Sequence, residues 1–299
     1  MTGVIAAEGL VQGFGRHRVL AGLDLAVPEG AVYAFVGANG AGKTTTIKTL
    51  LNLLKPVGGR ASVLGKDTRR LAAEDFREIG LVSEGLRLPL WMTAGEYLEY
   101  LRPFYPRWDV AMEAELVKQF DLPLGRALKH LSRGMRMKAA LVSALAFRPR
   151  VLFLDEPFSG LDAVVRDDLI QALLGRAEEM TVFLSSHDLG EIESFASHAG
   201  YLEDGRLKFS EEMASLVNRF REVEVTLGSA RALPESWPAA WLQPESAGAV
   251  VRFIDSAHEA VRTAAEIGRM FPGAKSVEAR PMSLRAIFVA LARGKKKAA

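Results

Sequence analysis

The sequence contains no cysteine among its 299 residues. Disulfide bonds and cysteine-ligated zinc sites are therefore excluded, and the composition fits a reducing compartment. A strong excess of one charge is missing as well, because the formal net charge is +2. Domains that bind nucleic acid usually carry a marked basic excess. We therefore expect no nucleic acid partner.

Long apolar runs are also missing. The longest candidate covers residues 139–147, about half of the roughly 18–20 residues that a membrane-spanning helix needs. The first 15 residues have neither a basic start nor an apolar centre, so we expect no signal peptide. We expect a soluble protein that reaches a membrane only through a partner.

The residues that are present indicate a folded α/β protein. Apolar residues make up 49% of the chain and charged residues 25%, which is an ordinary balance for a globular domain. Residues 31–36, 151–155 and 181–186 are nearly all apolar, as in strands buried on both faces of a parallel sheet. Helical patterns cover 43–54, 133–147 and 163–179. This alternation predicts an α/β core.

Two regions interrupt the alternation. Residues 56–67 contain turn signals between short strands, which predicts an antiparallel β region near the N-terminus. Thr93 and Glu96 have the spacing of a capping box, so we expect a helix to begin at Thr93. The prolines and aromatic residues at 103–108 are expected to end it, before a second helix over 109–120. We therefore expect a helical insertion between the strands of the sheet.

The pattern changes again near residue 220. Residues 222–227 alternate apolar and polar side chains, as a half-exposed strand does. A proline-rich connection is expected over 234–248 and a strand over 249–255. Two helices are predicted over 257–270 and 282–294, followed by a basic, solvated tail. The domains predicted from these changes are 1–219 and a small α+β appendage over 220–299.

The clearest chemical motif is "GANGAGKT", residues 37–44, which matches G-x-x-x-x-G-K-[ST]. It follows an apolar strand directly and opens a helix, which is the context that a phosphate-binding loop requires. Its glycines let backbone N–H groups converge on phosphate oxygens, and the helix N-terminus adds positive potential. Lys43 is expected to reach the β- and γ-phosphates, and the Thr44 hydroxyl to ligate Mg²⁺. The residues expected to bind the nucleotide here are Gly37, Asn39, Gly40, Ala41, Gly42, Lys43, Thr44 and Thr45.

Two more strand ends carry polar groups. Asp155 and Glu156 end the buried strand of "VLFLDEP", and ligands of parallel sheets bind at the carboxyl ends of the strands. Asp155 suits Mg²⁺, and Glu156 is placed to deprotonate an attacking water. His187 follows the strand of "SSHDL". A lone histidine is more often structural, but delivery to the same sheet edge favours a hydrogen bond to the γ-phosphate.

The ordered motifs "GANGAGKT", "LSRGM", "VLFLDEP", "SGLD" and "SSH" resemble the ATP-binding subunit of ATP-binding-cassette (ABC) transporters, over residues of about 4–215. The resemblance implies an α/β P-loop ABC ATPase core with an N-terminal antiparallel β region. It also implies an inserted helical subdomain at about 84–147. In that family two copies pair head to tail around two ATP molecules, and their closing and opening drives a membrane permease.

The resemblance also implies roles for residues outside the P-loop. Phe14 stands in the place of the aromatic residue that stacks on adenine, although a phenylalanine at a strand end can also belong to the core. Asp162 in "SGLD" matches a residue that communicates across the dimer. "LSRGM" matches the family signature, so Ser132 and Gly134 are implied to contact the γ-phosphate held by the other subunit. We expect Ser132 to cap the helix that follows it.

Three residues depart from the family pattern. Glu84 stands where the family usually has glutamine; an acid there can approach Mg²⁺ or the water, but it repels phosphate at close range. Arg133 and Met135 replace the first glycine and the glutamine of Leu-Ser-Gly-Gly-Gln. Together "VSE", "YPRWD" and "LSRGM" resemble the branch that serves export-type permeases.

The function implied is ATP hydrolysis with Mg²⁺ at two composite sites, in a homodimer or in a heterodimer with a related subunit. The residues expected to act in catalysis are Lys43, Glu156 and His187, and those expected at the metal are Thr44, Glu84 and Asp155. The protein is expected in the cytoplasm, on the inner face of the membrane, where a permease holds it. Leu88, Leu90 and Trp91 either form the docking patch for that permease or pack the subdomain's own core.

Other functions account for fewer of these motifs. A soluble ABC ATPase that acts on ribosomes or DNA usually carries two cassettes or a long coiled-coil insertion, and this sequence has neither. A P-loop kinase would explain residues 37–44 but not "LSRGM", "SGLD" or His187. A switch that binds ATP without hydrolysing it conflicts with the intact catalytic residues.

Overall fold

The computed structural model describes residues 3–83, 85, 87–188, 190, 192–230, 233–234 and 236–294. The chain forms two compact units, Met1–Ser210 and Glu211–Ala299. The division falls before residue 219 because helix α6 (Met213–Arg219) belongs to the second unit. Arg219, at the end of this helix, bonds to Glu211 and to the carbonyl of Ser256.

The first unit is built on a six-stranded sheet in the order β10-β9-β3-β8-β7-β6. The pairs of β3 with β8 and β9, and of β7 with β6 and β8, are parallel. Every residue of β3, β7 and β8 is buried, as predicted from their apolar runs. The strands are β3 (Val32–Val36), β6 (Ile79–Ser83), β7 (Val151–Asp155), β8 (Thr181–Ser186), β9 (His198–Glu203) and β10 (Arg206–Glu212).

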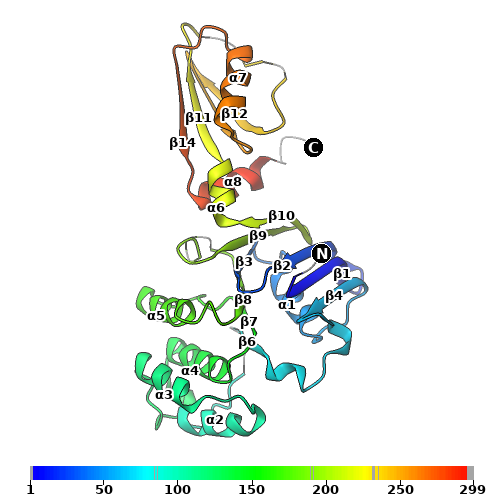
Figure 1. Ribbon diagram of the computed structural model, residues 1–299, viewed down its shortest axis with the longest axis vertical. Coiled ribbons are helices and arrows are strands. Elements are labelled where there is room, and N and C mark those ends of the chain that lie inside the picture. The colour runs from blue at the N-terminus through cyan, green and yellow to red at the C-terminus, as the bar shows by residue number, and fades with distance from the viewer. Residues whose placement is uncertain are drawn as a thin grey trace. The chain divides into compact units, whose positions relative to one another are not determined.

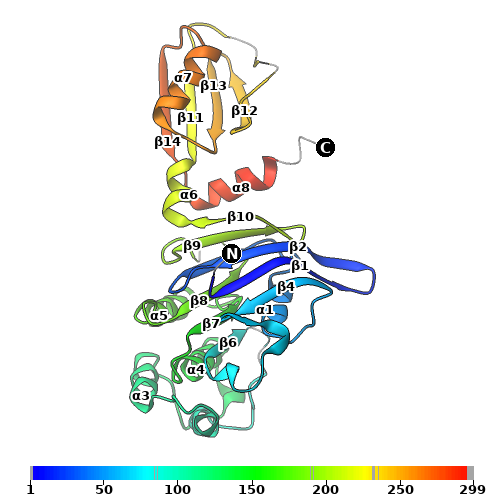
Figure 2. The same cartoon turned by 45° about the vertical axis from the view of Figure 1, so that its right-hand side comes forward.

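A second, antiparallel sheet confirms the β region predicted near the N-terminus. Its order is β2-β1-β4-β5, and helix α1 (Lys43–Leu50) lies next to it (Figure 2). Ile47 and Leu50 of α1 belong to one buried cluster with Phe35 and Phe153 of the large sheet. The same cluster includes residues of β1, β2 and β4, so α1 is packed against both sheets. The strands are β1 (Ile5–Phe14), β2 (His17–Val27), β4 (Gly58–Val63) and β5 (Lys66–Asp67).

The predicted helical insertion lies between β6 and β7. It contains α2 (Ala94–Leu101), α3 (Val110–Gln119) and α4 (Arg133–Leu145), and α5 (Ala163–Leu174) follows β7. Helices α4 and α5 lie beside the strands β6, β7 and β8 (Figure 1). The capping box at Thr93 and Glu96 is formed, so that predicted helix start is confirmed. Short 3₁₀ turns cover Thr68–Arg70, Asp75–Arg77, Arg102–Phe104 and Leu128–His130.

Two helices end before their predicted limits. In α1, Asn52 has a left-handed φ of 57°, and its N–H bonds to the carbonyl of Thr49. The N–H of Leu53 bonds to the carbonyl of Lys48. These two bonds form a Schellman motif, which closes the helix although apolar residues continue to 54. Helix α5 ends where Gly175 follows Leu174.

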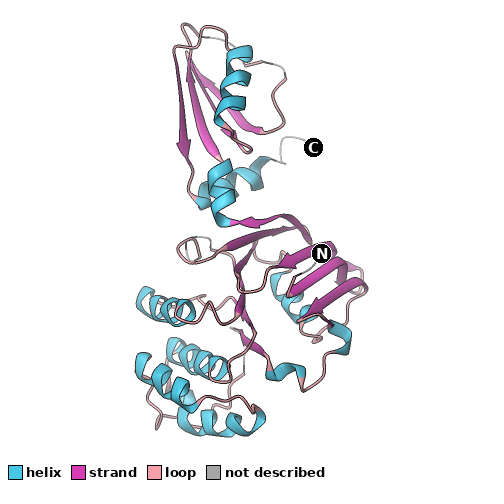
Figure 3. Cartoon of the chain, viewed as in Figure 1, coloured by secondary structure: helices cyan, strands magenta, loops and turns pink. Residues whose placement is uncertain are grey.

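The second unit contains an antiparallel sheet in the order β12-β13-β11-β14. Helix α7 (Ala260–Met270) covers one face of it (Figure 3). Trp241, Phe253 and Phe271 form the centre of its core. Helix α8 covers Leu284–Gly294. The strands are β11 (Arg221–Thr226), β12 (Trp241–Ala247), β13 (Val250–Asp255) and β14 (Ser276–Pro281).

The prediction of a connection over 234–248 is wrong, because β12 occupies half of it. Pro244 sits in this strand where the pairing with β13 shifts between Leu242 and Glu245, and proline is tolerated at such a bulge of an edge strand. Strand β14 was not predicted; all six of its residues are exposed, so it shows no apolar alternation. Over the described residues, no helix combines the length and the apolar character that crossing a bilayer requires.

Candidate functional site

The predicted phosphate-binding loop joins β3 to α1. Gly40 and Gly42 have φ of 83° and 110°, values that side chains other than glycine rarely adopt. At Gly37 the requirement for glycine is steric, since a Cβ there would lie 2.5 Å from the Leu202 carbonyl oxygen. The three glycines therefore serve the backbone path of the loop, which ends at the N-terminus of α1.

Lys43 turns back over this loop. Its ammonium donates to the carbonyls of Gly37 at 2.7 Å and Ala38 at 3.3 Å. It also lies 3.0 Å from Oε1 of Glu156. Only 6% of the side chain is exposed, so the charge is held in a nearly dry place where its interactions are strong. Lys43 thus places one positive charge where the loop meets Glu156.

Asp155 gathers hydroxyl groups from two other elements. Its Oδ1 accepts a hydrogen bond from Thr44 Oγ1 at 3.0 Å and one from Ser185 Oγ at 2.7 Å. Ser185 Oγ in turn accepts from the backbone N–H of Glu156 at 3.0 Å. Sequence reasoning missed Ser185, which stands next to Asp155 in the register of β7 and β8. Its position in the parallel sheet was the signal that could have found it.

The oxygens of Thr44 and Asp155 fit Mg²⁺. This ion prefers hard oxygen ligands and commonly takes one or two from protein, with phosphate and water completing its shell. No group of three or more histidine or acidic side chains suited to a metal occurs among the described residues, so a site made entirely of such side chains is not found there. Glu84, the third residue predicted at the metal, lies outside the described residues.

Glu156 connects the site to His187. Its Oε2 lies 2.7 Å from Nδ1 of His187, while Oε1 faces Lys43. The residue has a φ of 51°, and holding a side chain of this size there costs on the order of 1–3 kcal/mol. Such strain occurs at functional sites because it aims a side chain at one place. Glu156 thus contacts the other two residues predicted to act in catalysis, Lys43 and His187.

The signature residues begin helix α4. Ser132 Oγ accepts from the N–H of Met135 at 3.1 Å, which confirms the predicted cap. Its hydroxyl hydrogen remains able to donate to another acceptor. Gly134 is buried against α5, since a Cβ there would lie 3.0 Å from Cγ1 of Val165. Asp162 caps α5 by accepting from the N–H of Val165 at 2.9 Å.

A pocket beside the loop contains some of the remaining predicted residues. Asn39 and Ala41 line this pocket of about 430 Å³, together with Tyr201 from β9. His17, opposite Phe14 in the hairpin of β1 and β2, lines it as well. Phe14 itself is 54% exposed, so it is not a core residue. Thr45 is on α1, one residue after Thr44.

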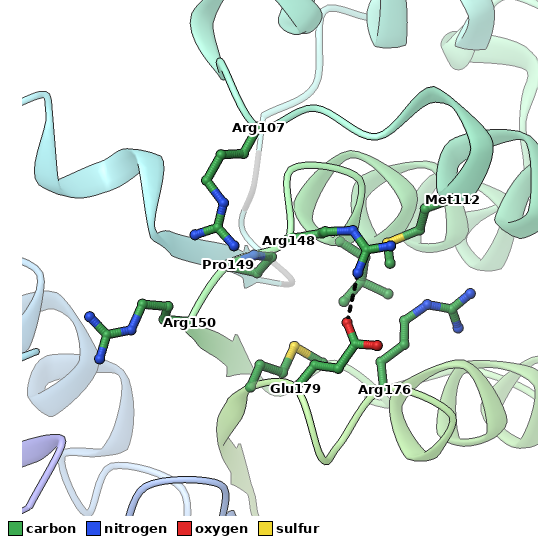
Figure 4. A pocket seen from close by; sticks show the side chains of 9 residues that line it. Arg107, Met112, Arg148, Pro149, Arg150, Arg176 and Glu179 are labelled. Carbon is green, nitrogen blue, oxygen red and sulfur yellow. Dashed lines mark hydrogen bonds and ion pairs between the residues drawn. The ribbon is translucent and has the colours of Figure 1, made fainter.

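An arginine-lined pocket lies at the opposite, amino end of the strands (Figure 4). Two of its arginines are paired with carboxylates: Arg148 with Glu179 at 3.0 Å, and Arg176 with Glu115 at 2.8 Å. None of the predicted site residues lines this cavity of about 170 Å³. The loop, the two acids and His187 therefore define the candidate site.

A large groove runs along the helical insertion. It has a volume of about 1190 Å³ and is lined by Leu88, Leu90, Trp91 and Tyr100, with Arg87, Arg133 and Arg136 among the other residues. Leu90 is 46% and Trp91 78% exposed. These two side chains therefore do not pack the core of the insertion, which was the alternative to a docking role.

Comparison with known proteins identifies several relatives, one of which matches nearly the whole chain. The ABC transporter family matches residues 20–159. The daunorubicin/doxorubicin resistance ATP-binding protein DrrA of Streptomyces peucetius is 32% identical, covering 97% of this chain and 92% of its own. The bacitracin transport ATP-binding protein BcrA of Bacillus licheniformis is 31% identical over 69% of each chain. The match to DrrA2 of Streptomyces coeruleorubidus is 36% identical and spans 65% of that protein.

Solved structures show the same fold. An ATP-binding subunit of an ABC transporter matches with a TM-score of 0.65 and 27% identity, covering 72% of this chain and 92% of that one. The dimeric cassette MJ0796 bound to ADP and Pi matches with a TM-score of 0.62 over 70% of this chain and 98% of that one. Its identity is 24%, so it supports the fold alone.

Proposed function

Because the chain belongs to the ABC transporter family, as an ATP-binding subunit of the export type, we propose that it hydrolyses ATP to power export through a separate membrane permease. The observation that carries the proposal is the position of Glu156, held between Lys43 and His187 beside the pair of Thr44 and Asp155. This arrangement provides a base, the Lys43 ammonium and hard oxygen ligands at one edge of the sheet.

Phosphate binding begins at Lys43. The ammonium is already placed by the loop carbonyls of Gly37 and Ala38, so little order is lost when it bonds to a β- or γ-phosphate oxygen. Backbone N–H groups of the loop and of the start of α1 supply further donors. Mg²⁺, held by Thr44 Oγ1 and the Asp155 carboxylate, would neutralise negative charge on the phosphates.

Hydrolysis is assigned to Glu156 and His187. The Glu156 carboxylate accepts a proton from water as the water oxygen attacks the γ-phosphorus and the bond to the β,γ-bridging oxygen breaks. A phosphate that engages Lys43 releases one carboxylate oxygen of Glu156 from its ion pair and so frees the base. His187, bonded to the other oxygen, orients the carboxylate and is placed to bond the γ-phosphate.

The site is proposed to be completed by a second copy or a related subunit. Ser132 and Gly134 begin α4, and the N-terminus of a helix favours an anion. We assign to them the γ-phosphate bound by the partner, with Asp162 beside them at the start of α5. Two such sites per dimer would couple ATP binding to closure.

The groove of Leu90, Trp91 and Tyr100 is the proposed contact with the permease. Tryptophan and tyrosine side chains are enriched at interface hot spots, and Arg87 and Arg136 suit a segment that also carries acidic residues. Docking there would hold the subunit at the inner face of the membrane. A role on ribosomes or DNA is less well supported, since the relatives described above are named for drug resistance and transport.

The proposal is tested by measuring ATP hydrolysis and ATP binding of the purified chain with Mg²⁺. Glu156→Gln is expected to bind ATP like the wild type and to lose at least about 100-fold in turnover, the scale of general-base catalysis. Glu179→Gln, the same change at the amino end of the sheet, is the matched control and is expected to keep the wild-type rate. Wild-type turnover by Glu156→Gln would exclude Glu156 as the base.

A further inference from the structure

Arg133 lies against a glycine of another element. Gly160, in the loop that follows β7, has a φ of 65°, and a Cβ there would lie 2.8 Å from Nη1 and 3.2 Å from Cζ of Arg133. The guanidinium therefore lies close against the backbone of this loop, and a side chain at position 160 would require the arginine side chain to shift. The first residue of α4 is in this way in contact with the loop of "SGLD".

The contacted loop carries functional residues at both ends. Glu156 precedes it and Asp162 closes it as the cap of α5. Inside the loop, the N–H of Ser159 bonds to the carbonyl of Glu156 at 3.3 Å, and the N–H of Leu161 to that of Phe158 at 3.1 Å. A displacement at Gly160 is therefore transmitted within a few residues to the base and to the cap.

The neighbouring residue of α4 touches the same unit. Gly134 packs on Val165 of α5, close enough that a Cβ would lie 3.0 Å from it. The first turn of α4 thus meets both the loop and the helix that the loop leads into. Arg133 also lines the groove described above, so a partner in the groove would touch the side chain that holds the loop.

A cation at this position is unfavourable for the helix itself. Arg133 is the first residue of α4, where the helix dipole disfavours positive charge. The helix alone therefore does not explain an arginine at this position, whereas contact with the loop backbone does. An arginine, with five donors in a rigid fork, is suited to hold a turn of backbone.

We propose that Arg133 is a positioning residue that braces the loop of residues 157–162 and thereby keeps Glu156 and Asp162 in their working places. The inference rests on the proposed function for its effect on turnover, but the brace itself can be measured without ATP. It assigns a role to the arginine that replaces a glycine of the usual signature.

The first experiment measures amide hydrogen exchange of the wild type, Arg133→Ala and Arg133→Lys without nucleotide. Exchange in the peptide covering 157–163 is expected to rise about tenfold in Arg133→Ala, because the loop then loses the guanidinium that packs against Gly160. The exchange rate of this peptide in Arg133→Lys is expected to lie between those of the wild type and Arg133→Ala. Exchange in the turn between β4 and β5 is expected to stay unchanged in both variants. Unaltered exchange at 157–163 would overturn the brace, whatever the protein's activity.

The second experiment is a double-mutant cycle on turnover. Arg133→Ala is expected to lower kcat about tenfold or more by misplacing the loop, with the KM for ATP unchanged because the phosphate loop is intact. In the wild-type background, Gly160→Ala is expected to lower kcat. In the Arg133→Ala background, it is expected to lower kcat by a further factor of less than about two, since the clash with the guanidinium is then gone. Gly65→Ala, at a φ of 78° with no atom within 4 Å of the added Cβ, is the control for backbone strain alone.

The outcomes of the cycle are distinct. Independent effects of the two substitutions, or a fall in kcat matched by an equal fall in thermal stability, would contradict a positioning role. A wild type that hydrolyses no ATP would refute the proposed function. The exchange experiment would then still test whether Arg133 stabilises the loop of residues 157–162.

Discussion

The ammonium nitrogen of Lys43 lies 3.0 Å from a carboxylate oxygen of Glu156. Lys43, the proposed phosphate ligand, thus forms an ion pair with Glu156, the proposed base that activates water. Since a phosphate competes with the carboxylate for the same ammonium, nucleotide binding and release of the base are linked by one ion pair. The phosphate loop therefore contributes both to the affinity for ATP and to the release of the catalytic base.

Lys43→Ala is expected to weaken ATP binding by at least about tenfold, because a hydrogen bond to a charged group contributes roughly 1.5–3 kcal/mol. Lys48→Ala provides the control, since Lys48 is on the same helix and exposed. Titration of a fluorescent ATP analogue would measure both. Equal affinities of the two variants would show that Lys43 does not bind phosphate.

The sequence predicted the elements of the site because each has a local cause. The apolar run of β7, the cap at Ser132 and the glycines of the loop are read from neighbouring residues, and all are present in the structure. Their mutual contacts could not be predicted in this way. The pairing of Lys43 with Glu156 and the left-handed φ of Glu156 depend on elements more than 100 residues apart.

The weaker predictions failed where tertiary structure overrides local pattern. Strand β12 contains Pro244, which reads as a breaker until the pairing with β13 provides a bulge for it. Helix α1 stops at a Schellman motif that apolar periodicity does not reveal. The closeness of Arg133 to Gly160 has no signal in either segment alone.

Arg102→Met should destabilise the helical insertion by about 2 kcal/mol, somewhat less than the loss of a fully buried partner because Arg102 is 40% exposed. Arg102 makes two bonds to the buried Glu113, at 2.9 and 2.7 Å, and only the bond from Trp108 would remain. Arg69→Met removes a similar pair of bonds to Asp67 at the surface and should cost much less stability, because solvent screens an exposed pair. Urea unfolding of both variants tests the difference, and equal losses would contradict it.

Stability should depend on pH through Asp109. Its pKa is lowered by the hydrogen bond from the backbone of Met112 and then by Arg148. A lowered pKa in the folded state stabilises the protein above the unfolded value of 3.8, and this contribution is lost as the pH falls through the folded value. Asp109→Asn should therefore be less stable than the wild type at pH 7, with a gap that closes in acid.

The control for this prediction is Asp121→Asn. Asp121 is exposed and its left-handed φ of 48° suits asparagine, so little change is expected at either pH. Urea midpoints measured from pH 7 to well below the unfolded value of 3.8 follow the loss of this contribution. A gap for Asp109→Asn that does not vary with pH would contradict the assignment.

Two chains are proposed to share each ATP, with Ser132 of one chain acting on the nucleotide bound by the other. The most direct measurement is the molar mass in solution of Glu156→Gln, with and without ATP, compared with that of Glu156→Gln carrying Ser132→Arg. ATP is expected to double the mass of the single variant from 32.6 kDa. The double variant should stay at the monomer mass while binding ATP with unchanged affinity. A single variant that remains monomeric with ATP, or a double variant that loses monomer affinity, would contradict the shared site.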